Sequence, residues 1–389
     1  MNHLHFVDKY GSFTMDKPEN VSYLYFPLAS ETGLKSSLTP NLGGDAKIDQ
    51  ETFLLEPVSA ENLHSNRGVR NFWLVDEDGQ AFSVSGASAR QEADRFTPAQ
   101  DDSRLTAGLM WQTVERTAQD LGLDTEVTAF CPRQDNVEIL CITVRNQQEQ
   151  PRWLTPIAAV PLYGRSADNI RDHRNVTSML HRIWTTENGV MVRPTMSFDE
   201  RGHRPNHKVY YVEGFGPEGQ KPEAFYPTVE SFLGEGGTYL HPRAVYEQYP
   251  GVKAGSRAEG REAMGAFRFP AITLAPGQEA HYVLLLGVED SEEAVNAIWD
   301  KYHSWEQVQA VLDETRSYWK EKVNVSFRTG DPDFDNLMKW VCFQPFLRRL
   351  FGCSFLPHHD YGRGGRGRGA RSRGGSFLFA CSYAFRTQY

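Results

Sequence analysis

The feature that most constrains the fold is a β-type pattern that extends from the N-terminus to about residue 288. Short runs rich in β-branched and aromatic residues, such as 71–75, 137–144 and 281–286, alternate with turn signals such as 76–79. No helical segments alternate with these runs, which favours antiparallel sheets packed face to face over a parallel sheet with crossover helices. The stretch is also too long for a sandwich of immunoglobulin size. We therefore predict an all-β first domain, residues 1–288, with extended, many-stranded sheets.

The sequence period changes from strand-like to helical after residue 288. Asp290 and Glu293 form a capping pattern, and apolar residues then recur at helical spacing. Ser304 with Gln307 repeats the pattern, which predicts either a second helix or a kink at this point. We assign residues 289–330 to a helical linker.

A further helix is predicted to begin at Asp331, because Asp is a favourable N-cap and Pro332 suits the first helical position. A short strand over residues 323–327 is expected before it. The helix over 333–351 is apolar on nearly all sides, so it needs burial against other helices. We interpret residues 331–367 as the start of a helical domain, and we expect the apolar helix to be exposed and to lower solubility.

Residues 358–367, with the sequence His-His-Asp-Tyr-Gly-Arg-Gly-Gly-Arg-Gly, concentrate imidazole, carboxylate, phenol and guanidinium groups in a glycine-rich segment. Glycine allows close backbone approach to a ligand, and arginine donates paired hydrogen bonds to vicinal hydroxyls or phosphate. Asp360, Arg363 and Arg366 are therefore the candidate substrate-binding residues. The two histidines lack a third ligand at suitable spacing, so no metal site is predicted.

Composition excludes several classes of function. The chain has 389 residues and a formal net charge of −9, which argues against a dedicated binder of nucleic acid or anionic membranes. No apolar run is long enough to span a membrane, and the first residues do not resemble a signal peptide. The five cysteines form no paired motif, so we expect reduced thiols and a cytoplasmic location.

Several longer stretches together resemble one protein family. They include Tyr10-Gly11-Ser12-Phe13, Thr39-Pro40-Asn41-Leu42-Gly43-Gly44-Asp45, Arg70-Asn71-Phe72-Trp73 and Gly108-Leu109-Met110-Trp111-Gln112-Thr113. Others cover residues 22–28, 53–64, 170–178 and 343–367. Residues 5–367 thereby resemble the N-terminal part of an inverting glycoside phosphorylase of the cellobiose phosphorylase family, glycoside hydrolase family 94. The likeness is greatest to the 1,2-β-oligoglucan phosphorylase branch.

The resemblance implies a galactose-mutarotase-like β-supersandwich, a helical linker, and a barrel of six helix pairs. It also implies reversible phosphorolysis of β-glucosides to glucose 1-phosphate. In that reaction one Asp protonates the leaving oxygen and inorganic phosphate attacks the anomeric carbon, so a second carboxylate is not required as base. The implied partners are a β-glucan oligosaccharide, phosphate as co-substrate and a second copy of the chain. No cofactor, nucleic acid or membrane is implied.

The sequence departs from the family pattern after Gly367. Relatives continue with Trp-Arg-Asp-Leu-Trp-Gln-Asp, whereas residues 363–375 here contain five arginines and six glycines. An amino-acid composition of this kind is typical of a GC-rich coding sequence read out of frame. We therefore expect residues 368–389 to be an anomalous tail that results from a truncated or frameshifted gene. The family's catalytic Asp has no counterpart here, and the chain by itself is expected to be inactive.

Other candidate residues have alternative interpretations. Residues 171–174, Arg-Asp-His-Arg, could act in acid–base chemistry or form a structural ion-pair cluster. Asp45 and Glu61 could be paired carboxylates, but neighbouring glycine and proline favour turn and interface roles. Trp73 and Trp111 lie in apolar runs, which favours core positions over a stacking platform.

Two other functions remain open at this point. A stand-alone carbohydrate-binding sandwich would need an exposed aromatic groove. The arginine- and glycine-rich segment beside Tyr361, Phe377 and Phe379 resembles segments that bind RNA, although it is short and the rest of the chain is acidic.

Overall fold

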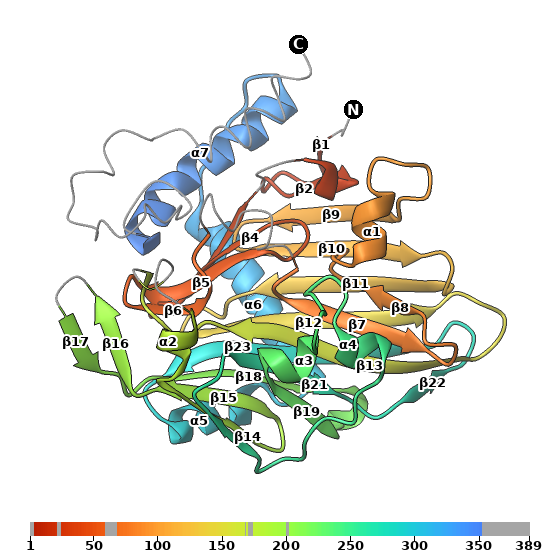
Figure 1. Ribbon diagram of the computed structural model, residues 1–389. Coiled ribbons are helices and arrows are strands. Elements are labelled where there is room, and N and C mark those ends of the chain that lie inside the picture. The colour runs from red at the N-terminus through yellow and green to blue at the C-terminus, as the bar shows by residue number, and fades with distance from the viewer. Residues whose placement is uncertain are drawn as a thin grey trace.

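The computed structural model describes residues 4–21, 25–58, 68–167, 169, 174–199 and 202–351. Over these residues the chain forms stacked antiparallel sheets, and its longest helices follow at the C-terminal end of the described part (Figure 1). The predicted mainly β fold, a supersandwich followed by helices, is confirmed.

The largest sheet has eleven strands. In spatial order these are β1 (Leu4–Phe6), β2 (Phe13–Asp16), β9 (Asp102–Gly108), β10 (Trp111–Ala118), β11 (Leu123–Phe130), β12 (Val137–Asn146), β23 (Glu279–Glu289), β18 (Val209–Phe215), β15 (Gly189–Pro194), β14 (His181–Thr185) and β20 (Arg257–Glu259). Every neighbouring pair is antiparallel, as predicted.

Three smaller sheets accompany it. The six-stranded sheet contains β19 (Ala224–Thr228), β21 (Ala263–Arg268), β13 (Arg152–Leu162), β7 (Asn71–Asp76), β8 (Ala81–Ser83) and β22 (Ile272–Leu274). The four-stranded sheet contains β3 (Phe26–Ala29), β4 (Lys35–Leu38), β5 (Gly44–Asp49) and β6 (Thr52–Leu55), and the two-stranded one β16 (Met196–Asp199) and β17 (Gly202–Pro205). Short helices lie in the connections: α1 (Ala89–Asp94), α2 (Arg174–Ser178), α3 (Val229–Leu233) and α4 (Arg243–Tyr246).

The main core lies between the sheets, and it explains part of the continuous apolar run from Ile139 to Ile142 in β12. Alternate side chains Leu140 and Ile142 enter this core together with Leu74 of β7. Ile139 and Cys141 point to the opposite face of the large sheet, where they pack under helices. Both faces of the strand are therefore buried in this region.

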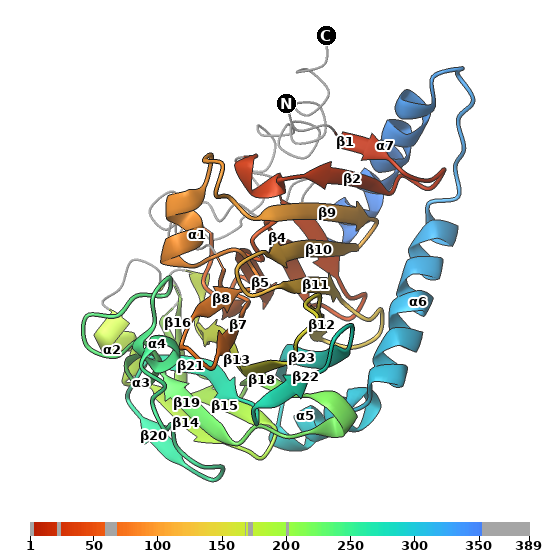
Figure 2. The same cartoon turned by 90° about the vertical axis from the view of Figure 1, so that its right-hand side faces the viewer.

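Helices α5 (Glu292–Tyr302) and α6 (Trp305–Lys322) cover that outer face at one end (Figure 2). Ser304 caps α6, because its side chain accepts a hydrogen bond from the backbone N–H of Gln307, as predicted. The cap of α5 was predicted one residue too early: Ser291, not Asp290, accepts the bond from Ala294. Asp290 instead pairs with Lys208 at 2.5 Å.

The strand predicted at residues 323–327 is absent. Val323 ends α6, since its N–H bonds to the carbonyl of Trp319, and residues 324–328 pair with no described strand. This segment connects two helices, and its backbone forms no ladder with any described strand. A β-branched pattern alone was therefore insufficient, because a strand needs a partner for its backbone groups.

Helix α7 (Pro332–Phe351) begins where predicted, and the Asp331 carboxylate accepts hydrogen bonds from the N–H groups of Asp333 and Phe334. Its predicted exposure is wrong. Trp340, Phe343 and Leu347 are buried in a second core that contains Phe13 of β2 and Trp319 of α6. The β1–β2 edge of the large sheet and α6 thus provide the burial that the helix needs.

Candidate functional site

The substrate-binding residues predicted from the sequence, Asp360, Arg363 and Arg366, lie outside the described residues. So do Glu61 and residues 171–173, while Arg174 belongs to α2 without a described side chain. Their predicted roles remain predictions.

Asp45, a candidate carboxylate from the sequence, forms hydrogen bonds inside the fold. It is fully buried in β5, where its carboxylate accepts hydrogen bonds from the Ser37 hydroxyl at 2.8 Å and from the N–H of Val58 at 3.2 Å. The bonds tie β5 to β4 and to residue 58. Asp45 is therefore a buried structural residue that lies in a strand rather than the predicted turn, and its predicted interface role stays a prediction.

The two tryptophans differ. Trp73 is completely buried and packs edge-on against Tyr246, so the predicted core position is confirmed. Trp111 is partly buried, and the guanidinium carbon of Arg316 on α6 lies 4.2 Å from its ring centroid. This contact helps to hold α6 against the large sheet.

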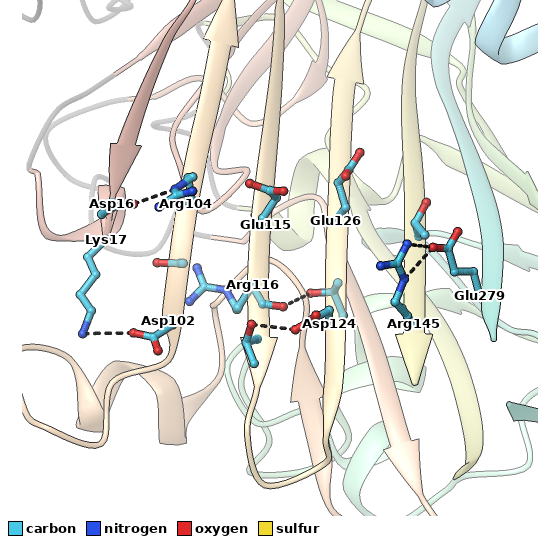
Figure 3. A pocket seen from close by; sticks show the side chains of 14 residues that line it. Asp16, Lys17, Asp102, Arg104, Glu115, Arg116, Asp124, Glu126, Arg145 and Glu279 are labelled. Carbon is cyan, nitrogen blue, oxygen red and sulfur yellow. Dashed lines mark hydrogen bonds and ion pairs between the residues drawn. The ribbon is translucent and has the colours of Figure 1, made fainter. Parts of the chain in front are cut away.

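A wide groove of about 830 Å³ lies on the outer face of the large sheet (Figure 3). Its walls come from six adjacent strands: β2, β9, β10, β11, β12 and β23. Every residue that lines it is charged or carries a hydroxyl group. These residues are Asp16, Lys17, Asp102, Ser103, Arg104, Glu115, Arg116, Thr117, Asp124, Thr125, Glu126, Thr143, Arg145 and Glu279.

Strand register arranges the polar side chains of the groove in two rows across the sheet. The first row runs from Asp16 through Arg104, Glu115, Glu126 and Thr143 to His281. The second row contains Asp102, Thr117, Asp124, Arg145 and Glu279. Because side chains alternate between the two faces of a strand, residues two apart on each strand project into the same groove.

Ion pairs fix both ends of the groove. Arg104 donates from Nε to Asp16 at 2.8 Å, and Arg145 donates from Nε to Glu279 at 2.6 Å. In the second row, the Thr117 hydroxyl donates to Asp124 at 2.7 Å. These contacts hold donors and acceptors in place before any ligand arrives.

The centre of the groove differs from its ends. Glu115 and Glu126 lie directly opposite each other on β10 and β11, and within the described residues neither forms an ion pair. Partial desolvation and the facing carboxylate of Glu115 raise the pKa of Glu126. The two carboxylates are thus held close together, and their oxygens can accept further hydrogen bonds.

Helix α6 approaches the groove at the β12–β23 side. The His281 ring stacks on Trp305, with ring centroids 4.2 Å apart, and its Nδ1 lies 3.1 Å from the hydroxyl oxygen of Thr143. Burial lowers the pKa of His281. An aromatic pair therefore lies next to the end of the first row.

No metal centre is present in the part of the chain that the structure describes, since no three His, Cys, Asp or Glu side chains there converge on one point. Cys131 and Cys141 are free and buried, and burial raises the pKa of both thiols, which disfavours the reactive thiolate.

Sequence reasoning missed the groove. The signal was present, because charged or hydroxyl residues two positions apart recur on successive strands, as in Asp102 and Arg104 or Asp124 and Glu126. Without the register between strands, nothing in the sequence brings these pairs together.

Among the described residues, no helix has the length and apolarity needed to cross a membrane. No protein of curated function matches the chain by sequence.

Several solved structures are similar to the chain at low identity. A bacterial glucoamylase in complex with acarbose is 8% identical, with a TM-score of 0.44 over 88% of this chain and 43% of that one. A GalM/aldose epimerase homologue from C. elegans is 10% identical, with a TM-score of 0.36 over 68% of this chain and 98% of that one. A putative kojibiose phosphorylase from the human microbiome is 9% identical, with a TM-score of 0.33 over 88% and 39%. The chain thus spans less than half the length of the glucoamylase and of the phosphorylase.

The family comparison is more specific than these structural similarities. The model described as glycosyl hydrolase 94, supersandwich domain, matches residues 46–305, which include most of the sheets and extend through α5. The chain therefore belongs to the glycosyl hydrolase 94 family and contains its supersandwich domain.

Proposed function

We propose that this chain is the supersandwich part of an inverting glycoside phosphorylase that acts on β-glucosides, with β-1,2-glucooligosaccharides as the preferred class. The observation that carries the proposal is the family match over residues 46–305. The order of elements supports it, because two linker helices and the apolar helix α7 follow the sheets. Asp360, Arg363 and Arg366 are proposed to bind sugar or phosphate.

The proposed reaction needs one general acid, which protonates the leaving oxygen, and one anionic nucleophile. Phosphate is already an anion, so it attacks the anomeric carbon without a protein base, and the acid protonates the leaving oxygen. We propose that the family's catalytic Asp has no counterpart among residues 1–389, since the sequence after Gly367 departs from the family pattern. The chain alone is therefore proposed to lack phosphorolytic activity.

The test is an assay of the purified chain with β-1,2-glucooligosaccharides and inorganic phosphate. We expect no glucose 1-phosphate above a phosphate-free control, and no synthesis from glucose 1-phosphate and an acceptor. Phosphate-dependent release of glucose 1-phosphate would overturn the proposal that the chain alone lacks phosphorolytic activity.

A further inference from the structure

The groove on the outer face of the large sheet lacks the chemistry for several kinds of ligand. Both signs of charge alternate along it, as in Asp16 and Arg104 or Arg145 and Glu279, so it has no single-sign field to attract a polyanion or a polycation. No apolar side chain lines it, which disfavours lipids and apolar small molecules.

Addition of a peptide strand is also disfavoured. Strands β9 to β12 and β23 are interior strands, and their backbone groups are hydrogen-bonded to neighbouring strands on both sides. A peptide that extends a sheet needs an exposed edge, which this part of the sheet does not offer. Only side chains are available for recognition here.

The groove matches a neutral ligand rich in hydroxyl groups. A hydroxyl donates to a carboxylate and accepts from a guanidinium or another hydroxyl, and the two rows present all three groups. The central pair Glu115 and Glu126 forms no salt bridge among the described residues, so carboxylate oxygens remain as acceptors. Burial raises the pKa of Glu126, and the more distant Arg316 opposes this electrostatically only in part. His281, at the end of the first row, stacks on Trp305 beside the groove, although neither ring is among the residues that line it.

The dimensions favour a chain over a single sugar. Six strands line the groove, and neighbouring strands are about 4.8 Å apart, so it extends roughly 24 Å across the sheet. Each row places a polar side chain on every strand it crosses, so contacts are available along this whole distance. We propose that the groove binds a neutral oligosaccharide across the strands, with Glu115 and Glu126 at its central subsite.

This inference rests on the proposed function only for the choice of a saccharide, and it concerns a surface that carries none of the proposed catalytic residues. Isothermal titration of the full chain is the test, with β-1,2-glucooligosaccharides, β-1,4-glucooligosaccharides and maltooligosaccharides as probes. We expect at least one probe to bind, with little change in affinity between low and high salt because the ligand is uncharged.

The decisive variant is E115Q/E126Q, which removes both charges and keeps the side-chain shape. Loss of two charge-assisted hydrogen bonds predicts affinity weaker by about tenfold or more. The matched control is E218Q/E235Q, which changes two exposed carboxylates far from the groove residues in the sequence, one in the short 3₁₀ helix Pro217–Gly219 and one in a turn. It should bind like the parent chain. Thermal unfolding of each variant checks that folding is unchanged.

Two results would overturn the inference: no binding of any neutral oligosaccharide by the parent chain, or equal binding by E115Q/E126Q. In either case the groove is only a solvated sheet face. Neither result bears on phosphorolysis, which the separate glucose 1-phosphate assay tests, so the two proposals fail independently.

Discussion

At the scale of single residues, the ion pair between Arg70 and Glu138 lies deepest in the structure. Both side chains are 0% exposed, and Arg70 Nε donates to Glu138 at 2.5 Å. The remaining arginine donors bond to the backbone carbonyls of residues 42, 43 and 45, and the Ser36 hydroxyl donates to Glu138. The pair thus joins the large sheet to the four-stranded sheet.

We predict that R70M lowers the free energy of unfolding by about 3–5 kcal/mol, because it leaves the Glu138 charge buried without a partner. The matched control is R145M, which breaks an Arg–Glu pair whose arginine is 51% exposed and should cost at most about 1 kcal/mol. Urea unfolding curves measure both. Equal losses for the two variants would show that the buried pair has no special role.

Glu213 links stability to pH. It is almost fully buried, its only described hydrogen bond comes from Thr186, and burial raises its pKa from 4.5 to about 7. The folded state therefore favours the protonated acid. Its contribution to stability is fully present below pH 4.5 and is lost as the pH rises through 7.

We expect E213Q to be more stable than the parent chain above neutral pH, by up to about 3 kcal/mol, and similar to it near pH 4. E235Q changes an exposed loop carboxylate and should leave the pH dependence of unfolding unaltered. Urea midpoints across this pH range provide the measurement. A parallel shift of E213Q at all pH values would mean that the charge of Glu213 is not the cause.

At the scale of elements, α7 depends on a few contacts with distant parts of the chain. Trp340 donates from Nε1 to the carbonyl of Gly11 at 2.8 Å and packs against Phe13. Glu31 accepts hydrogen bonds from Tyr318 of α6 at 2.8 Å and from Arg349 of α7 at 2.7 Å. The N-terminal segments therefore position the helix that precedes the proposed substrate-binding residues Asp360, Arg363 and Arg366 in the sequence.

W340A should release α7 from the sheet, with a loss of about 3–5 kcal/mol in the free energy of unfolding. Hydrogen exchange should rise across residues 332–351 and stay unchanged in β12. The control on the same helix is F334A, whose parent side chain is 46% exposed and should cost about 1 kcal/mol or less. Protected α7 amides in W340A would contradict the assigned packing.

The elements also show how far local sequence patterns predict structure. The caps at Ser304 and Asp331 were predictable because capping is local chemistry between residues two or three apart. The false strand at 323–327 and the burial of α7 depended on which segments lie nearby in space. The groove required register across six strands, which the sequence of any one strand does not contain.

At the scale of the whole molecule, the chain combines a many-stranded sandwich with helices that extend along it (Figure 2). The charged groove crosses the large sheet from β2 to β23, and α7 packs near β1 and β2 at one edge of the same sheet. The proposed carbohydrate surface and the packing site of α7 thus both involve β2.

The most direct test of the central claim joins residues 1–351 to the helical catalytic domain of a 1,2-β-oligoglucan phosphorylase and measures glucose 1-phosphate formation. The control is the catalytic domain without this supersandwich. We predict phosphate-dependent release of glucose 1-phosphate from β-1,2-glucooligosaccharides by the fusion alone. A folded, soluble fusion that releases no glucose 1-phosphate from β-glucosides would contradict the assignment of this chain to a glycoside phosphorylase.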